Sequence, residues 1–191
     1  MEVTVPDRRN SILDAAVRVI ARAGVRGLRV EELAAEAGVS MALIYYHFGD
    51  RAGLLRRTLE HINDRAASYT RKPAGPDPRR EVERLLLLEL QDTDEVRVNS
   101  TAWGELRATA VFDDDLREPL AASTKVWVDE IAAAITRAQR AGSVSGNVRP
   151  AEAADLLTAL VEGLSDRWLS GSMTLARARR LLRGAIAAEL D

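Results

Sequence analysis

Residues 29–48 decide the fold, and they form the stretch RVEELAAEAGVSMALIYYHF. Leu33 and Ile44 are spaced so that two short helices pack against each other. Gly38 can adopt the left-handed conformation that a tight turn requires, and Ser40 is a favourable N-cap for the second helix. The order of helix, tight turn and helix predicts a helix-turn-helix, whose second helix enters the DNA major groove. An ordinary helical hairpin is the alternative.

Helical spacing continues on both sides of this motif. One apolar stripe runs from about Asp7 to Ala23, and a further helix begins at Asp50 and continues past Tyr69. The prolines of residues 73–78 end that helix. Beyond them the pattern predicts helices at residues 78–92, 94–112, 114–141, 150–170 and 174–189. The sequence therefore predicts an all-α protein of about nine helices, in which a long fourth helix joins two domains.

Composition limits the chemistry that the chain can perform. Its 191 residues include no cysteine and two histidines, which excludes thiol catalysis, disulfides and a multi-histidine metal centre. A phosphate-binding Gly-Lys loop, His-Glu-x-x-His and Gly-x-Ser-x-Gly are absent from the sequence. We therefore predict no catalytic residue, metal or cofactor, with a helical enzyme or adaptor as the rival class. The sequence has neither a membrane-spanning apolar run nor a signal peptide, which predicts a soluble cytoplasmic protein.

Charge is distributed unevenly along the chain. The formal net charge of −2 argues against a nucleic-acid binder at first sight. Residues 1–57, however, contain nine Arg and seven acidic residues, a balance of +2, whereas residues 58–191 contain 18 basic and 22 acidic residues, a balance of −4. Phosphate contact needs local positive charge and not a positive total. The distribution is compatible with a DNA-binding N-terminal domain.

From Ile12 to about Leu55 the sequence resembles the DNA-binding domain of the TetR family of bacterial transcriptional regulators. The matching residues are Ile12 to Ala16, Gly27, Leu33, Ala34, Ala37 to Ser40, Tyr45, His47, Phe48, Leu54 and Leu55. The remainder resembles the family's ligand-binding domain in its helix pattern, and Trp103 and residues 160–171 resemble its choline-responsive BetI-like branch. The resemblance implies a DNA-binding domain at residues 7–57 and a ligand-binding and dimerisation domain at residues 58–191.

The resemblance also implies which side chains contact DNA. Tyr45, His47 and Arg51 would bind backbone phosphates, and Arg29 would add a charged phosphate contact. Base edges would be contacted by Met41, Ala42, Tyr46 and Glu31, through thymine methyl groups and, for Glu31, the cytosine amino group. The predicted DNA-binding residues are Arg29, Glu31, Ser40, Met41, Ala42, Tyr45, Tyr46, His47 and Arg51. Ile44 and Phe48 would be core, and core packing is the alternative for one of the two tyrosines.

Aromatic residues of the C-terminal part predict a ligand cavity. Three tryptophans fall on three different predicted helices and could line one apolar pocket. A carboxylate among indoles would suit a cation. Core packing is the alternative for each tryptophan, and surface solvation is the alternative for Glu105 and Arg107. The predicted ligand-binding residues are Tyr69, Trp103, Glu105, Arg107, Phe112, Trp127 and Trp168.

The last two predicted helices carry apolar stripes that are wide enough to pack inward and also to meet a second subunit. The predicted dimerisation residues are Leu157, Leu160, Val161, Leu164, Leu175, Leu182 and Ile186. The expected partners are thus double-stranded operator DNA, a second copy of the chain and a small-molecule effector, without a membrane. The expected function is a repressor that its effector releases from DNA, and an activator of the same family is the alternative.

Overall fold

The computed structural model describes residues 7–70 and 77–191, and the side chains of residues 67–70 lie outside this description. All regular secondary structure in these ranges is helical, which confirms the predicted all-α fold. The helices are α1 (Arg8–Gly27), α2 (Val30–Ala37), α3 (Met41–Phe48), α4 (Arg51–Thr70), α5 (Pro78–Leu88), α6 (Asp94–Ala110), α7 (Asp114–Arg140), α8 (Pro150–Leu169) and α9 (Leu175–Leu190). Across the described ranges, no helix is both long enough and apolar enough to span a bilayer.

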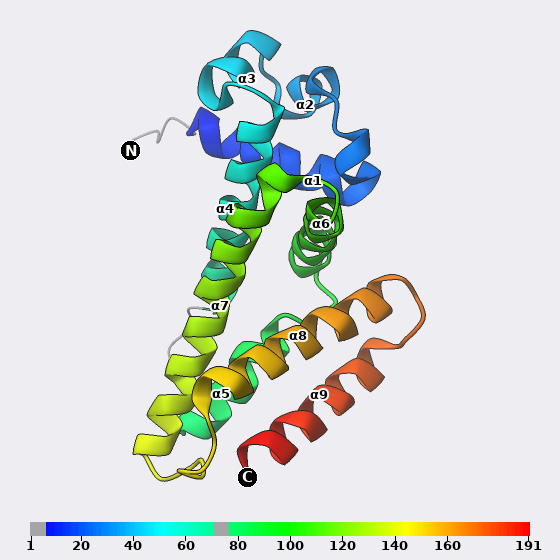
Figure 1. Cartoon of the computed structure of the whole chain (residues 1–191). Helices are drawn as coiled ribbons and strands as arrows, with labels where there is room; N and C mark the ends of the chain where they lie inside the picture. The colour runs from blue at the N-terminus through cyan, green and yellow to red at the C-terminus, as the bar shows by residue number, and fades with distance from the viewer. Residues whose placement is uncertain (1–6, 71–76) are drawn as a thin grey trace, which may run out of the picture.

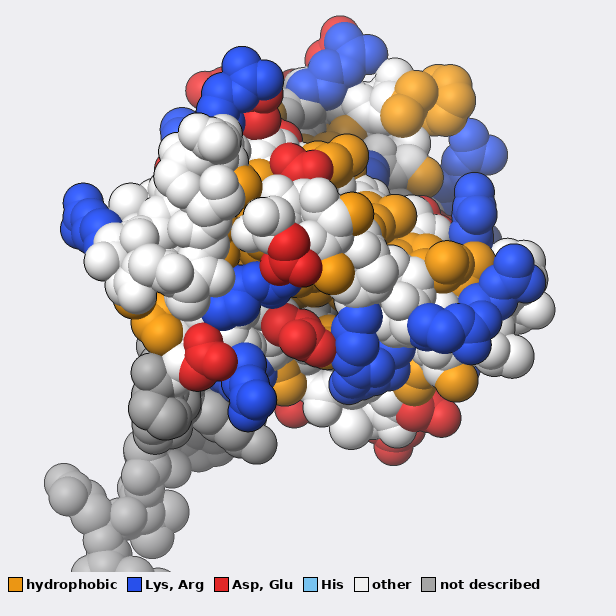
Figure 2. Space-filling model, turned by 90° about the horizontal axis from the view of Figure 1, so that it is seen from below, with side chains coloured by type: hydrophobic (Ala, Val, Ile, Leu, Met, Phe, Trp, Pro, Cys, Tyr) orange, Lys and Arg blue, Asp and Glu red, His pale blue; other side chains and the backbone are white. Residues whose placement is uncertain are grey.

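The helices form an elongated molecule with α1, α2 and α3 at one end (Figure 1). Helices α4 and α7 run side by side from this end toward α5, α8 and α9, and α6 lies beneath α1. Seen from the end opposite α3, apolar side chains lie between Arg and acidic side chains (Figure 2). Both signs of charge are therefore present at that end of the molecule (Figure 2).

Two apolar cores hold this arrangement together. The first contains residues of α1 to α4 together with Leu106 of α6 and Leu116 of α7. The second contains residues of α5, α7, α8 and α9. The predicted boundary after residue 57 falls inside α4, where Leu59 and Ile62 still belong to the first core. Helices α4 and α6 therefore connect the DNA-binding end to the rest of the chain.

One predicted helix end differs from the structure. Helix α1 was expected to stop at Ala23, but it continues to Gly27 across a kink at Gly24, where φ is 72° and ψ is 170°. The N–H of Val25 donates to Glu105 Oε2 of α6 at 3.2 Å, and the Arg51 guanidinium of α4 donates to the Val25 carbonyl. We call these two hydrogen bonds the Val25 joint. They supply hydrogen-bond partners for the N–H and the carbonyl of Val25 next to the kink, where the regular helical hydrogen bonding is interrupted.

The partly buried carboxylate of Asp14 links α1 to α4. The Asp14 Oδ1 atom accepts hydrogen bonds from His61 Nε2 and Arg65 Nη1, both at 2.8 Å. Partial burial raises the pKa of Asp14, but the hydrogen bonds and charges of His61 and Arg65 outweigh it and hold this pKa below its usual value. The link therefore favours the ionised carboxylate in the folded protein.

We expect Asp14→Asn to lower the free energy of unfolding at pH 7 by at most about 1 kcal/mol, because the carboxylate is 41% exposed and partly screened. A folded-state pKa below the unfolded one gives stability that is present above the unfolded pKa and is lost as the pH falls through the folded pKa. The difference between the two proteins should therefore be smaller at about pH 3, below the unfolded pKa, than at pH 7. Urea unfolding at both pH values measures it, and an equal deficit at low pH would show that the charge is not responsible.

Candidate functional site

Helices α2 and α3 form a helix-turn-helix at the tip of the molecule (Figure 1). Helix α2 ends at Gly38, which adopts the left-handed conformation with φ at 65°. The Ser40 hydroxyl accepts the N–H of Leu43 at 3.2 Å and so starts α3. Ile44 and Phe48 are 2% and 7% exposed, so one side of α3 packs on the first core. The opposite side of α3 is thereby directed outward.

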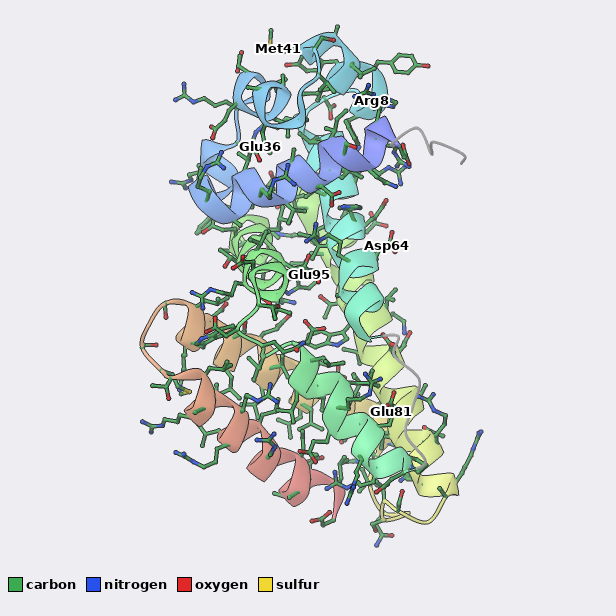
Figure 3. The ribbon with its side chains drawn as sticks, turned by 180° about the vertical axis from the view of Figure 1, so that it is seen from behind. Arg8, Glu36, Met41, Asp64, Glu81 and Glu95 are labelled. Atoms are coloured by element: carbon green, nitrogen blue, oxygen red, sulfur yellow. The ribbon has the colours of Figure 1, made fainter. Side chains whose placement is uncertain are left out.

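That outward side of α3 is unusually apolar for a surface. Met41, Tyr45 and Tyr46 are 45%, 50% and 81% exposed, and Ala42 is exposed as well. Met41 points away from the body of the molecule at its extreme tip (Figure 3). We call Met41, Ala42, Tyr45 and Tyr46 the reading face. Both tyrosines lie on the surface, so core packing does not explain either of them.

The remaining predicted DNA contacts surround the reading face. Arg29 is exposed immediately before α2, where its side chain makes no capping hydrogen bond, and Glu31 is exposed in the first turn of α2. His47 is half-buried, with its ring centroid 5.2 Å from that of Tyr46. Arg51 is exposed but already donates to Val25 in the joint, so a phosphate would have to use its other N–H groups. These DNA contacts stay predictions.

Ion pairs between α1 and α2 hold the motif in place, and the sequence analysis did not identify them. Arg18 contacts Glu36 at 2.8 Å, and Arg22 contacts Glu32 at 2.7 Å and Glu36 at 3.4 Å. The hydrogen bond from Arg18, its charge and the contacts of Arg22 together hold the pKa of Glu36 below its usual value. The acidic side chains of α2 that face α1 are therefore balanced by arginines.

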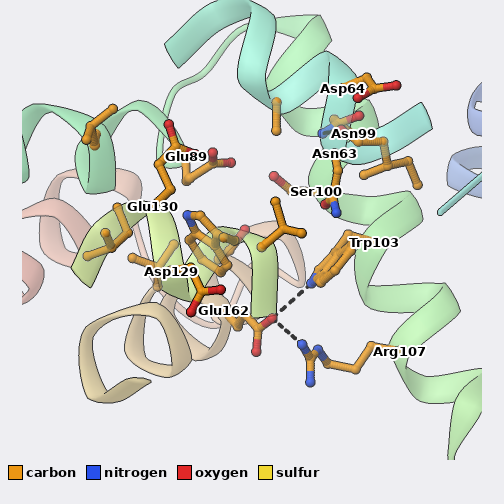
Figure 4. Close-up of a pocket in the computed structure, with 18 of the residues that line it drawn as sticks. Asn63, Asp64, Glu89, Asn99, Ser100, Trp103, Arg107, Asp129, Glu130 and Glu162 are labelled. Carbon is orange, nitrogen blue, oxygen red and sulfur yellow. Dashed lines mark hydrogen bonds and ion pairs between the residues drawn. The ribbon is translucent and has the colours of Figure 1, made fainter. Parts of the chain in front are cut away.

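A cavity of about 570 Å³ lies between α4, α5, α6, α7 and α8 (Figure 4). Among the described residues, its lining includes the indoles of Trp103 and Trp127, six carboxylate residues and a single basic residue, Arg107. Four of the acidic residues, namely Asp64, Asp129, Glu130 and Asp166, are largely exposed or at the rim. The surplus of negative charge and the indole faces favour a cation in this cavity.

Glu162 of α8 is the acidic side chain of this cavity that contacts both Trp103 and Arg107. Its Oε1 accepts a hydrogen bond from Trp103 Nε1 at 2.9 Å and forms an ion pair with Arg107 (Figure 4). The Arg107 guanidinium carbon lies 5.5 Å from the centroid of the Trp103 ring. The sequence analysis missed Glu162, although a lone acid between Val161 and Leu164 on a buried helix face is a signal that could have found it.

The predicted ligand-binding residues separate in the structure. Trp103, Arg107 and Trp127 line the cavity, but Glu105, Phe112 and Trp168 do not, and the side chain of Tyr69 lies outside the described residues. Glu105 belongs instead to the Val25 joint, because it projects from the side of α6 that faces α1. Phe112 is 85% exposed on the turn after α6, whereas Trp168 packs in the second core beneath Arg97. These three residues therefore lie outside the cavity that Trp103 and Trp127 line.

The predicted dimerisation residues need a similar correction. Leu157, Val161, Leu164, Leu182 and Ile186 are at most 3% exposed and pack inside the second core, while Leu160 and Leu175 are half-buried against it. The outward side of the two helices carries different residues, which we call the α8–α9 face: Leu156, Ala159 and Gly163 of α8 with Leu181 and Gly184 of α9. Leu156 and Leu181 are 55% and 43% exposed.

Comparison with known proteins gives a consistent result for both parts of the chain. Residues 12–58 match the family described as bacterial regulatory proteins, tetR family, and residues 78–191 match the C-terminal domain of the BetI-type transcriptional repressor. The HTH-type transcriptional regulator BetI of Burkholderia lata is 27% identical over 169 residues, which cover 87% of this chain and 82% of that protein.

Solved structures agree with this assignment. A TetR-family transcriptional regulator from Rhodococcus sp. is 49% identical, with a TM-score of 0.92 over 96% of this chain and 98% of that one. A transcriptional regulator from Saccharomonospora viridis, solved in complex with choline, is 27% identical, with a TM-score of 0.78 over 95% of this chain and 96% of that one. Together with the helix-turn-helix at its tip, these matches show that the chain is a DNA-binding transcriptional regulator that belongs to the TetR family.

Proposed function

We propose that the chain is a cytoplasmic, dimeric repressor that a small organic cation releases from its operator. The observation that carries the proposal is the cavity in which Glu162 of α8 accepts a hydrogen bond from the Trp103 indole of α6, the helix that also packs on α1 at the DNA-binding end. The choline bound to the Saccharomonospora viridis protein supports a quaternary ammonium as the effector class. The names of the BetI relatives support a transcriptional role for the chain.

The proposed DNA contacts follow from exposure and charge. Three residues of the reading face, Met41, Ala42 and Tyr46, would lie against base edges, where their methyl and aromatic groups favour thymine methyls and local DNA shape. Arg29, Tyr45, His47 and Arg51 would fix the position of α3 through phosphates. Ser40 and Glu31 lie at the starts of α3 and α2, on the same end of the molecule.

The proposed dimer uses the α8–α9 face. Gly163 and Gly184 are exposed in the middle of helices, and a Cβ added to either would lie more than 4 Å from every atom outside the adjoining backbone of its own helix. Glycine in a helix interior costs about 1 kcal/mol relative to alanine, so these positions are best explained by another backbone that approaches closely. The neighbouring Leu156 and Leu181 would supply the apolar area of the contact.

The proposed coupling runs through α6. Trp103 and Arg107 of α6 line the cavity, and Glu105 between them reaches the N–H of Val25 in α1. A ligand that moves α6 would therefore disturb the Val25 joint and shift the position of α3. A ligand shifts an equilibrium only through its different affinities for the two conformations. Release therefore requires the effector to bind the conformation that does not fit DNA more tightly than the conformation that does.

Fluorescence anisotropy with DNA that flanks the chain's own gene tests the proposal. We expect tight binding that choline or tetramethylammonium reverses, with sodium chloride at the same ionic strength as the control for counterion effects. If saturating cation leaves the affinity for that DNA unchanged, release by a cation is wrong. A reporter gene behind the same DNA separates repression from activation, because deletion of the regulator raises expression only in the first case.

Replacement of Arg29 and of Met41 by alanine should affect DNA binding in different ways. Arg29→Ala should weaken binding to all DNA sequences alike and lower the slope of log affinity against log salt by about 1, because it removes one phosphate contact. Met41→Ala should leave that slope unchanged and alter the preference between base pairs by about 1 kcal/mol. Arg140→Ala, at the far end of α7, is the matched control. Anisotropy titrations over a salt series measure both quantities, and equal salt slopes for Arg29→Ala and the wild type would contradict the assignment.

A further inference from the structure

The strongest unassigned feature is the guanidinium of Arg107, which occupies a cation-binding arrangement inside the cavity. It lies against the Trp103 ring, with 5.5 Å between the guanidinium carbon and the ring centroid, and it forms an ion pair with Glu162 (Figure 4). The Trp103 Nε1 hydrogen bond orients the same carboxylate. An indole and an oriented carboxylate are the groups that attract an organic ammonium ion. Arg107 and a cationic effector would therefore use the same partners.

The hydrogen bonds of Arg107 are incomplete for a permanent structural ion pair. Its Nη2 is shared between Glu162 and the Thr124 hydroxyl, which lies at 3.1 Å. Its Nε is buried and has no hydrogen-bond partner among the described residues. Buried donors are normally satisfied, and the pair is 35% and 19% exposed, so solvent screens it. In this position Arg107 thus leaves part of its hydrogen-bonding capacity unused.

A second hollow gives the Arg107 side chain somewhere to move. This hollow, of about 690 Å³, lies against α6, α7 and α8 and shares Arg107 and Asp129 with the cavity. Thr124, which Arg107 already contacts, lines it, and Asp155 supplies a further carboxylate. Its other cations are already engaged. Lys125 pairs with Asp129, and Arg117 donates to the carbonyls of Ala110 and Val111.

We propose that Arg107 is an internal competitor of the effector, which leaves Glu162 and Trp103 when an organic cation binds and turns toward the second hollow. The inference rests on the proposed cationic effector. It adds the residue that sets the concentration of effector needed to fill the cavity. Apparent affinity falls in proportion to the fraction of time for which the site is open. If Arg107 occupies it for about 90% of the time, the effector binds about tenfold more weakly than the site itself would allow.

Calorimetric titration of the full chain with choline and with tetramethylammonium tests the proposal. We expect Arg107→Gln to bind both cations about tenfold more tightly than the wild type. Arg107→Lys, which keeps the positive charge, should stay within about threefold of the wild type. Arg107→Met keeps the apolar stem and provides a second neutral variant, and thermal unfolding checks that each protein is folded. Arg117→Gln, whose side chain lines the second hollow but not the cavity, is the matched control.

The outcomes separate this inference from the proposed function. If the wild type binds either cation and the neutral variants bind it equally or more weakly, Arg107 is no competitor and only this inference is overturned. Weaker binding of trimethylglycine alone to the neutral variants would also overturn it, because Arg107 would then hold the carboxylate of a zwitterion. If neither the wild type nor the folded neutral variants bind any of these cations, the proposed effector class is wrong, and the inference falls with it.

Discussion

Gly163→Arg and Gly184→Arg are each expected to yield a folded monomer that binds its operator about 100-fold or more weakly than the wild type. A Cβ at either position lies more than 4 Å from every atom outside the adjoining backbone of its own helix, so we attribute the effect to a second copy. The two half-sites of an operator bind a dimer with the avidity of linked sites, which a monomer loses. Sedimentation velocity gives the oligomeric state, and anisotropy gives the operator affinity.

The alanine variants at the same positions should show opposite effects on stability and association. Gly163→Ala is expected to stabilise the helix by about 1 kcal/mol and yet weaken the dimer, because a methyl group separates the facing backbones. Gly146→Arg in the α7–α8 loop serves as the matched control, because a Cβ there also lies in open space. If Gly163→Arg and Gly184→Arg remain dimeric, the α8–α9 face is not the interface.

Glu162→Gln is expected to reduce the affinity for choline or tetramethylammonium by about 30-fold, which corresponds to about 2 kcal/mol. The variant keeps an oxygen that can accept the Trp103 hydrogen bond, but it removes the negative charge beside the indole. Operator affinity without cation should stay within about threefold of the wild type, because the residue lies away from α3. Calorimetry measures the first quantity and anisotropy the second.

Asp129→Asn is the matched control for that experiment. Asp129 also lines the cavity, but Lys125 binds its carboxylate at 2.8 Å and the side chain is 62% exposed. Its removal should change cation affinity by less than about threefold. If Asp129→Asn and Glu162→Gln weaken binding equally, the cation is attracted by the overall negative charge of the cavity and not by an oriented carboxylate.

The sequence predicted the helices well because the groups that start and end them are local. Ser40 caps α3 through a residue three positions away, and Gly38 ends α2 by its own backbone conformation. The kink in α1 could not be predicted in this way. It is held by Glu105, which is 80 residues distant from Val25 in sequence, so local chemistry at Gly24 indicated an end to the helix.

The candidate sites were predicted less completely, for a related reason. An apolar stripe shows that a helix face is buried but not what buries it, so Leu157 was assigned to a dimer contact although it packs inside the subunit. Its neighbour Leu156 points about 100° away around the helix and is exposed. In the same way, Trp168 and Trp103 have equivalent sequence patterns, and only the packing of α8 on α6 separates a core indole from a cavity indole.

The Val25 joint also affects how such regulators can diversify. Both of its hydrogen bonds are made to the main chain of Val25, and every residue except proline offers the same N–H and carbonyl. A sensor with a different cavity could therefore be joined to the same DNA-binding end, provided that it kept a Glu at the position of Glu105 and the chain kept Arg51. Ligand specificity and base-pair preference can then change independently, since neither the cavity side chains nor the reading face takes part in the joint.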